Sequence, residues 1–521
     1  MVKERRYISK SGWCVEEKLV GGGSRTPAQL FPEKYQRRRR LLILIIIFVV
    51  LVVIILVTIG LVQKLVLTKT LKYGIVIDAG SSHTSLYIYQ WPAEKMNDTG
   101  LVTELTSCKV KGPGISSYWM DVKKAGLSLK HCLRYAKEQL PDKQHHETPV
   151  YLGATAGMRL LRSQNQNLSQ DILTSVEEFI KTFPFNFRGA RIISGKDEGA
   201  FGWITINYLM GNFLQDQDGG NRPTVGALDL GGASTQITFI PDGKIESVAS
   251  SLHFRLYGKS YNMYTHSYLC YGKDQALKML LGQLNVTNDG SMWNPCFNSG
   301  YSQVINLTTF FNTPCTSGPQ TTTHQTVTLN GTGDSAQCSN YVKTIFNDSP
   351  CDWSSCSFDG IYQPPVQGKF AAFSAFYFVM NFLNVTEESD FDKVKKSVDS
   401  FCSRPWSEVR SSFSIEEQYL SEYCFAGHYV LSLLHRGYNF TSNNWNSIKF
   451  MRKINGNNAG WTLGYMLNLT NMIPVELPYT RPFTYTSYLT VMVIFSLLLL
   501  ILLSVGCLIY KKKLCSVENK I

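Results

Sequence analysis

Two short glycine-rich turns, each following an apolar run and an aspartate, constrain the fold of this chain most strongly. The first is Tyr73–Ser82 (YGIVIDAGSS) and the second is Val225–Ser234 (VGALDLGGAS). In each, small and branched apolar residues predict a buried strand that ends in an aspartate, followed by glycine and hydroxyl side chains. A single turn of this kind is more often an ordinary tight turn. Two copies about 150 residues apart indicate an internal repeat, and hence two related lobes that share a cleft.

The order of residue types in these turns suits phosphate chemistry. A carboxylate at the end of a strand can hold a divalent cation through its waters, and glycines let backbone N–H groups approach a phosphate. Hydroxyl groups add further hydrogen-bond donors. We therefore expect Asp78 and Asp229 to face a shared phosphate-binding cleft.

The basic character of the chain comes largely from two short clusters. The 521 residues carry a formal net charge of +12, much of it in Arg37–Arg40 and Lys511–Lys513. Each cluster flanks a long apolar run, at Leu41–Val62 and at Tyr488–Tyr510. Both runs are long enough to cross a bilayer as helices, and the first lacks the features of a cleaved signal peptide. A membrane explains these charges better than nucleic acid, which we exclude as a partner.

The positive-inside rule predicts that both termini are cytosolic and that residues 63–487 lie outside the cell or in a lumen. Glycosylation sequons agree, because they all fall between the spans, at Asn97, Asn167, Asn285, Asn306, Asn330, Asn384, Asn439 and Asn468. Ten of the 13 cysteines also lie there, which predicts five disulfides of open connectivity. Their spacing does not indicate a zinc site. Palmitoylation stays open for the other three, Cys14, Cys507 and Cys515.

Three further features carry chemistry. An apolar strand that begins at Pro149 runs into the turn Gly153–Gly157, which places Thr155 at a helix N-terminus, as an anion ligand or as an ordinary N-cap. Another strand ends before a helix that begins with Asp197 and Glu198. These acids are either partners of the helix dipole, or one of them is a base that accepts a proton from water. The amide of Gln236 can position a water molecule.

Other stretches have simpler interpretations. Residues 1–40 lack a sustained apolar period and predict a disordered cytosolic tail. Residues 270–356 are poor in helical period and predict a disulfide-stapled insertion without a catalytic role. Aromatic clusters at 370–378 and 421–425 are typical of a core, although a ring at a cleft rim can stack on a nucleobase. The turn at 459–470 is expected to close the first lobe.

Five of these segments together resemble the apyrase conserved regions of the ectonucleoside triphosphate diphosphohydrolases. They have the family's order and spacing: Asp78–Thr84 (DAGSSHT), Gly153–Gly157 (GATAG), Gly195–Gly199 (GKDEG), Asp229–Gln236 (DLGGASTQ) and Gly460–Gly464 (GWTLG). The resemblance covers residues 72–474 and the two-span topology. It departs at Lys196-Asp197, where relatives commonly have Gln-Glu, and in the long N-terminal tail.

The resemblance implies an α/β ectodomain between two transmembrane helices, with the two lobes and ribonuclease-H-like sheets of the actin, Hsp70 and sugar-kinase superfamily. It implies these boundaries: a cytosolic tail 1–40, a transmembrane helix 41–62, lobe I 72–194 with a return segment 451–478, lobe II 195–450 with the insertion, a transmembrane helix 488–510 and a tail 511–521. The implied disulfides are Cys108–Cys132, Cys270–Cys315, Cys296–Cys338, Cys351–Cys356 and Cys402–Cys424.

The implied activity is extracellular hydrolysis of nucleoside tri- and diphosphates, such as ATP and ADP, to the monophosphate plus phosphate, which regulates purinergic signalling. It requires Ca²⁺ or Mg²⁺, held through water by Asp78 and Asp229. Glu198 matches the general base, and the other catalytic positions are Thr155, Ser234 and Gln236. Implied phosphate-binding positions are Gly80, Ser81, Ser82, His83, Gly232 and Ala233. Phe378 and Tyr423 match the aromatic positions that enclose the base.

Two other functions stay open at this point. A kinase or chaperone-type ATPase of the same superfamily also has paired phosphate loops, but such proteins are usually cytosolic. A catalytically silent nucleotide-binding cell-surface receptor would not need Glu198, both aspartates and Gln236. Small residues in the spans, such as Gly60 and Gly506, are a weak indication of homo-oligomers formed through the membrane helices.

Overall fold

The computed structural model describes residues 4–9, 12–17, 30–68, 71–93, 95–96, 98–213, 223–319, 324–387, 390–472 and 484–518. The chain forms two compact units. One combines residues 1–70 with 477–521, and the other is residues 71–476.

The first unit contains a hairpin and two long helices. Strands β1 (Glu4–Ser9) and β2 (Gly12–Glu17) pair antiparallel, and helix α1 (Leu30–Thr68) follows. The prediction of a disordered tail over residues 1–40 is therefore wrong for these stretches. Aromatic and β-branched residues in both strands favour a paired hairpin, a signal too short for an analysis of periodicity.

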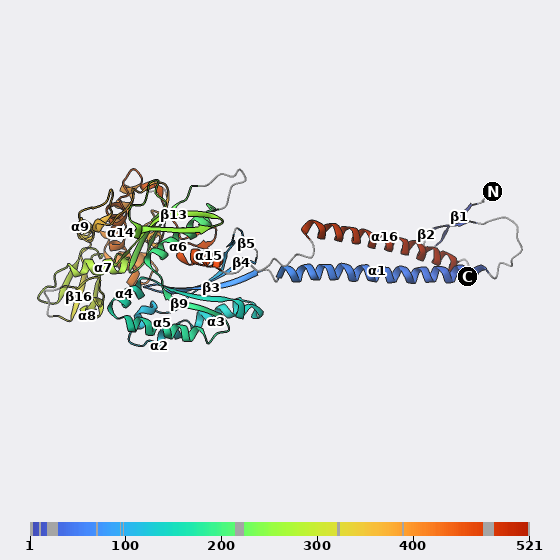
Figure 1. The fold of residues 1–521 in the computed structure, drawn as a ribbon, viewed down its shortest axis with the longest axis horizontal. Helices are drawn as coiled ribbons and strands as arrows, with labels where there is room; N and C mark the ends of the chain where they lie inside the picture. The colour runs from blue at the N-terminus through green and yellow to red at the C-terminus, as the bar shows by residue number, and fades with distance from the viewer. Residues whose placement is uncertain are drawn as a thin grey trace. The chain divides into compact units, whose positions relative to one another are not determined.

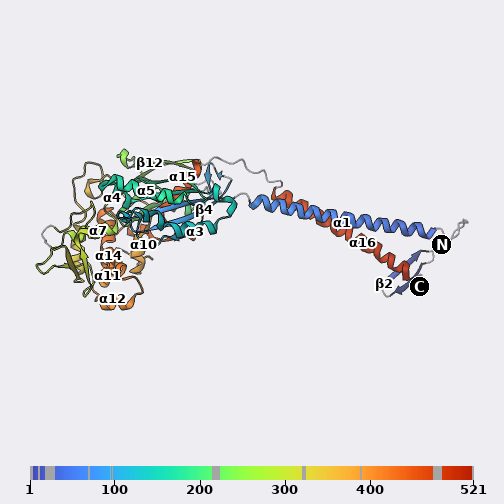
Figure 2. The same cartoon turned by 90° about the horizontal axis from the view of Figure 1, so that it is seen from below.

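Both predicted membrane segments are helical, in α1 and in α16 (Tyr485–Glu518). By length and composition alone, Arg39–Val62 and Tyr485–Lys511 can cross a membrane. The two helices lie side by side (Figures 1 and 2), and a methyl group at Gly506 would lie 3.5 Å from Ile45 Cγ2. Cys507 is an exposed free thiol, whereas the side chains of Cys14 and Cys515 lie outside the described ones.

The second unit begins with a five-stranded sheet of order β7-β4-β3-β8-β9. Its strand β3 is buried on both faces, because Ile75 and Ile77 belong to one hydrophobic core and Val76 to another. β3 pairs antiparallel with β4 and parallel with β8. The strands are β3 (Leu71–Ala79), β4 (Thr84–Pro92), β7 (Thr103–Lys109), β8 (Pro149–Ala154) and β9 (Asn186–Ile192).

A six-stranded sheet repeats this arrangement, with the order β12-β13-β11-β10-β17-β18. Here β10 pairs antiparallel with β11 and parallel with β17, as β3 does with β4 and β8. The internal repeat expected from the two glycine turns is thus present in the topology. The strands are β10 (Gly226–Leu230), β11 (Ser234–Phe239), β12 (Ser251–Leu256), β13 (Lys259–Leu269), β17 (Phe370–Ser374) and β18 (Ile448–Phe450).

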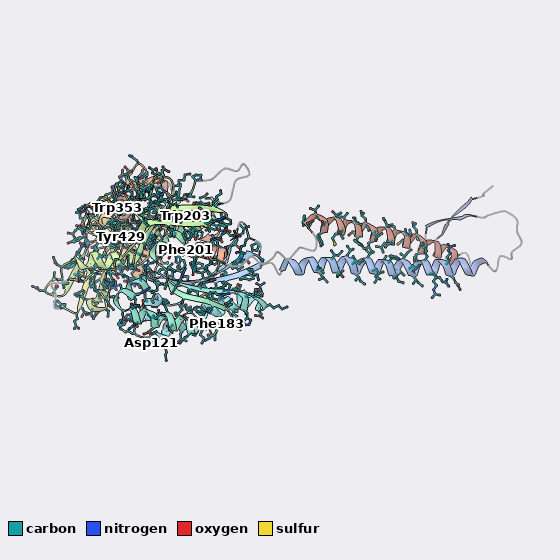
Figure 3. All side chains as sticks on the ribbon, viewed as in Figure 1. Asp121, Phe183, Phe201, Trp203, Trp353 and Tyr429 are labelled. Carbon is teal, nitrogen blue, oxygen red and sulfur yellow. A yellow bond between two sulfur atoms is a disulfide. The ribbon has the colours of Figure 1, made fainter. Side chains whose placement is uncertain are left out.

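Two central helices, α6 (Gly195–Leu209) and α15 (Trp461–Met472), pack against each other between the sheets (Figure 1). Their apolar side chains share one core with residues of both sheets, including Val76 of β3 and Ala227 of β10. Phe201 and Trp203 of α6, labelled in Figure 3, belong to this core. The site residues of the two sheets are therefore fixed on one continuous hydrophobic scaffold.

The remaining elements cover the sheets or form small additions. Around the first sheet are β5 (Lys95–Met96), β6 (Thr99–Gly100), α2 (Lys123–Ser128), α3 (Lys130–Gln139), α4 (Ala156–Gln164) and α5 (Gln166–Ile180). Further helices are α7 (Lys273–Gly282), α8 (Leu307–Phe310), α9 (Ser335–Lys343), α10 (Ala375–Phe382), α11 (Phe391–Cys402), α12 (Trp406–Ser412), α13 (Glu417–Ser421) and α14 (Tyr423–Ser432). Short strands are β14 (Ser291–Asn294), β15 (Ser302–Asn306), β16 (Thr326–Gly331), β19 (Lys453–Ile454) and β20 (Asn457–Asn458).

All five disulfides have the pairing that the resemblance implied: Cys108–Cys132, Cys270–Cys315, Cys296–Cys338, Cys351–Cys356 and Cys402–Cys424. Three of them lie within the region 270–356, as expected of a stapled insertion. Although its sequence is poor in helical period, this region contains the helices α7, α8 and α9. The α/β, two-lobed fold is confirmed, whereas the exact domain boundaries stay a prediction.

Candidate active site

Three acidic side chains from three elements converge in the interior of the second unit. Asp78 ends β3, Asp229 lies in β10, and Glu198 lies in the first turn of α6 with 8% of its surface exposed. Burial raises the pKa of Asp78 well above its usual value, and the negative charges of Glu198 and Asp229 raise it further. Burial and Glu198 raise the pKa of Asp229 to about 7. The three carboxylates therefore repel one another in a site of low dielectric.

These carboxylates fit a divalent cation. Oδ1 of Asp78 is buried without a hydrogen-bond partner, and its carboxylate receives a hydrogen bond from the indole of Trp461. Among the ion pairs of the described residues, neither Asp78 nor Asp229 has a cationic partner. Hard divalent cations prefer carboxylate oxygens and keep part of their water shell. A cation beside the two aspartates would offset their repulsion.

Glu198 is the acidic side chain of this group that has a cationic partner. Its Oε2 lies 2.8 Å from Nη2 of Arg159 and accepts a hydrogen bond from Nε2 of Gln236 at 3.3 Å. The alternative role of the α6 acids as helix-terminal groups applies to Asp197. The hydroxyl of Ser194 caps the helix by accepting from the Asp197 N–H at 3.0 Å.

Gln236 and Ser234 complete a hydrogen-bonded group around Glu198. Nε2 of Gln236 donates to Oγ of Ser234 at 2.7 Å and to Oγ of Ser267 at 2.9 Å. Arg159 Nη2 also donates to Oγ of Ser234, at 2.9 Å. The structure thus brings together Glu198, Gln236 and Ser234, all three predicted from the sequence. Arg159 and Ser267 were missed, since both lie within ordinary helix or strand patterns.

The two glycine turns meet face to face. A methyl group at Gly232 would lie 2.3 Å from the Ser82 hydroxyl and 2.9 Å from the Ser81 hydroxyl, so a larger residue there would have to displace these side chains. Ala233 is buried against Ala156 at the start of α4. Gly80, Ser81, Ser82 and His83 are partly or fully exposed in the turn between β3 and β4. The predicted phosphate-binding positions of both turns therefore share one location.

Thr155 occupies the N-cap position of α4, and its backbone N–H donates to the Ala79 carbonyl at 3.1 Å. Its side chain is buried but makes no capping hydrogen bond. The ordinary role of an N-cap threonine is thus not fulfilled, which favours the ligand role. Three predicted phosphate segments, from β3, β8 and β10, meet around the carboxylates.

A charged chain of side chains adjoins the first glycine turn, and the sequence did not indicate it. Ser82 Oγ donates to Oδ2 of Asp274 at 2.9 Å. Nζ of Lys273 lies 2.7 Å from Oδ1 of Asp274 and 2.5 Å from Oε2 of Glu422. The start of α7 thus contacts the first glycine turn, and the expectation that residues 270–356 have no catalytic role stays a prediction. The Cys270–Cys315 disulfide fixes the chain just before that helix.

The predicted nucleobase residues lie on elements that leave the site. Phe378 is 49% exposed in α10, whose preceding residue Ser374 hydrogen-bonds the Asp229 carboxylate. Tyr423 opens α14 directly after Glu422 and stacks on Phe382, with ring centroids 3.7 Å apart. The ring contacts of the described residues do not join Phe378 to Tyr423. Their role in holding a base stays a prediction.

Comparison with known proteins places this chain in a family. The chain matches the GDA1/CD39 (nucleoside phosphatase) family over residues 64–482. Ectonucleoside triphosphate diphosphohydrolase 1 of Mus musculus is 50% identical over 471 residues, which are 88% of this chain and 92% of that protein. Ectonucleoside triphosphate diphosphohydrolase 8 of Homo sapiens is 44% identical over 423 residues, 80% of this chain and 86% of that protein.

The fold also agrees with a solved structure. The crystal structure of nucleoside triphosphate hydrolases from Neospora caninum aligns with a TM-score of 0.57, covering 81% of this chain and 95% of that one at 14% identity. At that identity the likeness concerns the fold alone. The sequence matches carry the family, and they confirm the resemblance drawn from the five motifs. The chain belongs to the GDA1/CD39 (nucleoside phosphatase) family.

Proposed function

We propose that this chain is an apyrase, which hydrolyses nucleoside tri- and diphosphates to the monophosphate and inorganic phosphate. The observation that carries this proposal is the convergence of Asp78, Asp229 and Glu198 beside two opposed glycine turns. The names of the similar proteins support the substrate class. No observation favours a catalytically silent receptor.

Glu198 is the proposed general base. Its carboxylate is positioned by Arg159 and by the amide of Gln236, and a water molecule held between Glu198, Gln236 and Ser234 would be aimed at the terminal phosphorus. The water gives one proton to Glu198 as its oxygen forms a bond to phosphorus. The bridging P–O bond breaks in line, and its electron pair stays on the oxygen of the nucleotide.

The glycine turns would hold the transferring phosphate. Backbone N–H groups around Gly80, Gly232 and Ala233 can approach its oxygens closely, and hydroxyls of Ser81, Ser82 and Thr155 with His83 supply further donors. The proposal includes no covalent enzyme intermediate. Positioning of the reactants and neutralisation of charge by these groups would therefore account for the rate. Phe378 and Tyr423 would enclose the base by stacking on its two faces.

A divalent cation, Ca²⁺ or Mg²⁺, is part of the proposal. Asp78 and Asp229 would hold it through its waters, and when bound it supplies positive charge that orients and neutralises the phosphates. The unpartnered Oδ1 of Asp78 and the raised pKa of Asp229 support this assignment.

For location, we infer a plasma-membrane protein with two spans, cytosolic termini and an extracellular catalytic domain. The apolar helices, the basic residues that flank them and the five disulfides of residues 71–476 support this orientation. The small residues of the membrane helices do not by themselves support self-association. Gly506 already packs on Ile45 of the same chain.

The test is phosphate release from ATP and from ADP by the purified full chain, with Ca²⁺ or Mg²⁺ and with EDTA. We expect cation-dependent release from both nucleotides, reduced about 10²- to 10⁴-fold in Glu198→Ala. The matched control is Asp197→Ala, which removes the neighbouring acid whose partner is Ser194. It should keep activity within about threefold. Equal losses in both variants, or an active Glu198→Ala, would contradict the assigned base.

A further inference from the structure

A groove of about 490 Å³ lies beside the candidate reaction centre, and no proposed step uses it. Arg159 and Ser267 form part of its wall, next to Gly195 and Lys196 at the start of α6. Trp353, labelled in Figure 3, contributes an aromatic part of the wall with Tyr362. The groove is open to solvent, since Trp353 itself is 42% exposed.

Two residues, Arg159 and Ser267, belong both to the groove wall and to the hydrogen-bonded group around Glu198. Arg159 lines the groove, and its guanidinium binds Glu198 at 2.8 Å and Ser234 at 2.9 Å. Ser267 also lines the groove while its hydroxyl accepts from Gln236 at 2.9 Å. Glu198, Ser234 and Gln236, which are proposed to hold the attacking water, are thus bonded to residues that line the groove.

The lining of the groove is mostly apolar, with a few polar groups that can contact a hydrated oxyanion. Lys196 supplies a cation whose Nζ donates to the Ser251 carbonyl at 2.9 Å, and Ser247 and Ser250 add hydroxyl groups. Burial lowers the pKa of His266 in the wall to about 4, so its ring is uncharged at neutral pH. Because a water molecule occupies about 30 Å³, the volume admits phosphate with part of its hydration shell.

The order of events during hydrolysis creates a need for such a path. This step rests on the proposed function. In-line attack forms inorganic phosphate on the water side, next to Glu198, while the shortened nucleotide still occupies the space between the glycine turns. The phosphate then has two ways out: after the nucleotide, or past Arg159. We propose that the groove is the exit subsite for the inorganic phosphate product, with Arg159 and Lys196 as its cationic side chains.

The experiment fills the groove and separates cleavage from release. Ala249 lines the groove and is exposed, so Ala249→Trp narrows the path without disturbing a core. The matched control is Val248→Trp, the neighbouring position, which is 87% exposed and absent from the lining. Rapid-quench measurements on the full chain with ATP report cleavage, and a fluorescent phosphate sensor reports release.

We expect Ala249→Trp to leave single-turnover cleavage within about twofold of the unchanged protein and to slow phosphate release about tenfold or more. Val248→Trp should change neither rate. Equal slowing of cleavage and release would overturn the proposal, because the groove would then serve water entry or local structure. Unchanged release in Ala249→Trp would overturn it as well.

A second variant does not depend on the tolerance of a tryptophan. Lys196→Gln should weaken inhibition by added orthophosphate severalfold, and Lys196→Arg should retain it, because the charge is kept. Unchanged inhibition in Lys196→Gln would contradict the subsite. A wild-type chain that cleaves no nucleotide would sink the proposed function and the exit path together, whereas normal cleavage with groove-independent release would sink the exit path alone.

Discussion

Arg159 connects the two halves of the site at the level of single side chains. It projects from α4, beside the first sheet, and binds Glu198 of α6 and Ser234 of β11. Its third contact is to the Ile193 carbonyl at 3.1 Å. A buried carboxylate that loses the one cationic partner it has among the described residues is left uncompensated, at a cost of about 3–5 kcal/mol. Arg159 is therefore a positioning residue for the proposed base.

The geometry predicts that Arg159→Lys lowers kcat about 10- to 100-fold while KM changes less than about threefold, because lysine keeps the charge but loses the planar fork. Arg162→Lys is the control, since Arg162 is exposed on the same helix. Steady-state kinetics with ATP and ADP give both constants. A variant with normal kcat would show that the ion pair has no part in positioning Glu198.

The raised pKa of Asp229 predicts that the stability of the folded protein depends on pH in the absence of metal. Its folded pKa of about 7 lies above the ordinary value of an aspartate, so protonation favours the folded state. The stabilisation is complete below the unfolded pKa and is lost as the pH rises through about 7. In EDTA, the melting temperature should therefore fall between about pH 4 and pH 8.

Asp229→Asn removes this penalty. In EDTA at pH 8 the variant should be more stable by roughly 1–4 kcal/mol, since each unit of pKa difference corresponds to about 1.4 kcal/mol. It should also lose the rise in melting temperature that Ca²⁺ gives the unchanged protein. Thermal unfolding followed by tryptophan fluorescence measures both effects. A variant less stable than the parent in EDTA would contradict the repulsion assigned to this site.

The three acids could be predicted from the sequence, whereas several residues that contact the acids or the glycine turns could not, for a physical reason. Local patterns of an apolar strand followed by glycine and hydroxyl residues indicate a phosphate-binding turn, and these patterns contain Asp78, Glu198 and Asp229. Asp274, by contrast, binds Ser82 across 192 residues, and such a pair leaves no local pattern. Ser374 is another example, because its left-handed backbone, with φ of 55°, becomes visible only in the folded chain.

Among the elements, α15 shows how one glycine sets the distance between two helices. Gly464 packs directly on α6, so that a methyl group there would lie 2.0 Å from the Phe201 carbonyl oxygen. Its N–H donates to the Thr205 hydroxyl at 2.8 Å. The backbone of α6 cannot yield without moving Glu198 in its first turn. The tight contact between α15 and α6 thus helps to fix the position of Glu198.

Gly464→Ala should destabilise the unit of residues 71–476 by about 3 kcal/mol or more, because the clash is with backbone and not with a flexible side chain. Gly460→Ala is the matched control, as nothing lies within 4 Å of a methyl group there. Surface delivery and thermal inactivation of the two full-length variants are the measurements. Equal behaviour of the two would refute the role given to the α6–α15 contact.

Element types were predictable where the pattern was long or repeated. The strands before Asp78 and Asp229 and the helix after Thr155 follow from apolar runs bounded by glycine. The helices α7 and α9 were not foreseen, since dispersed cysteines and polar residues obscured their period. In this region long-range burial and disulfides determine the structure more than local propensity does.

At the scale of the molecule, a repeated sheet explains why two distant turns form one site. In each sheet a central strand carries the aspartate, a hairpin partner lies on one side and a parallel strand on the other. The helices α6 and α15 between the sheets share one hydrophobic core with both aspartate-bearing strands, and the charges of Glu198 and Asp229 act on Asp78. The duplication was evident from sequence, whereas the N-terminal hairpin was not.

The most direct test of the account measures phosphate released outside intact cells that express the full chain. ATP or ADP is added to the medium with Ca²⁺ or with EDTA, and wild type is compared with Glu198→Ala at equal surface display. The account predicts cation-dependent release from both nucleotides by wild type, without permeabilisation, and almost none by the variant. Release only after permeabilisation, or none from a well-displayed wild-type chain, would contradict an extracellular apyrase.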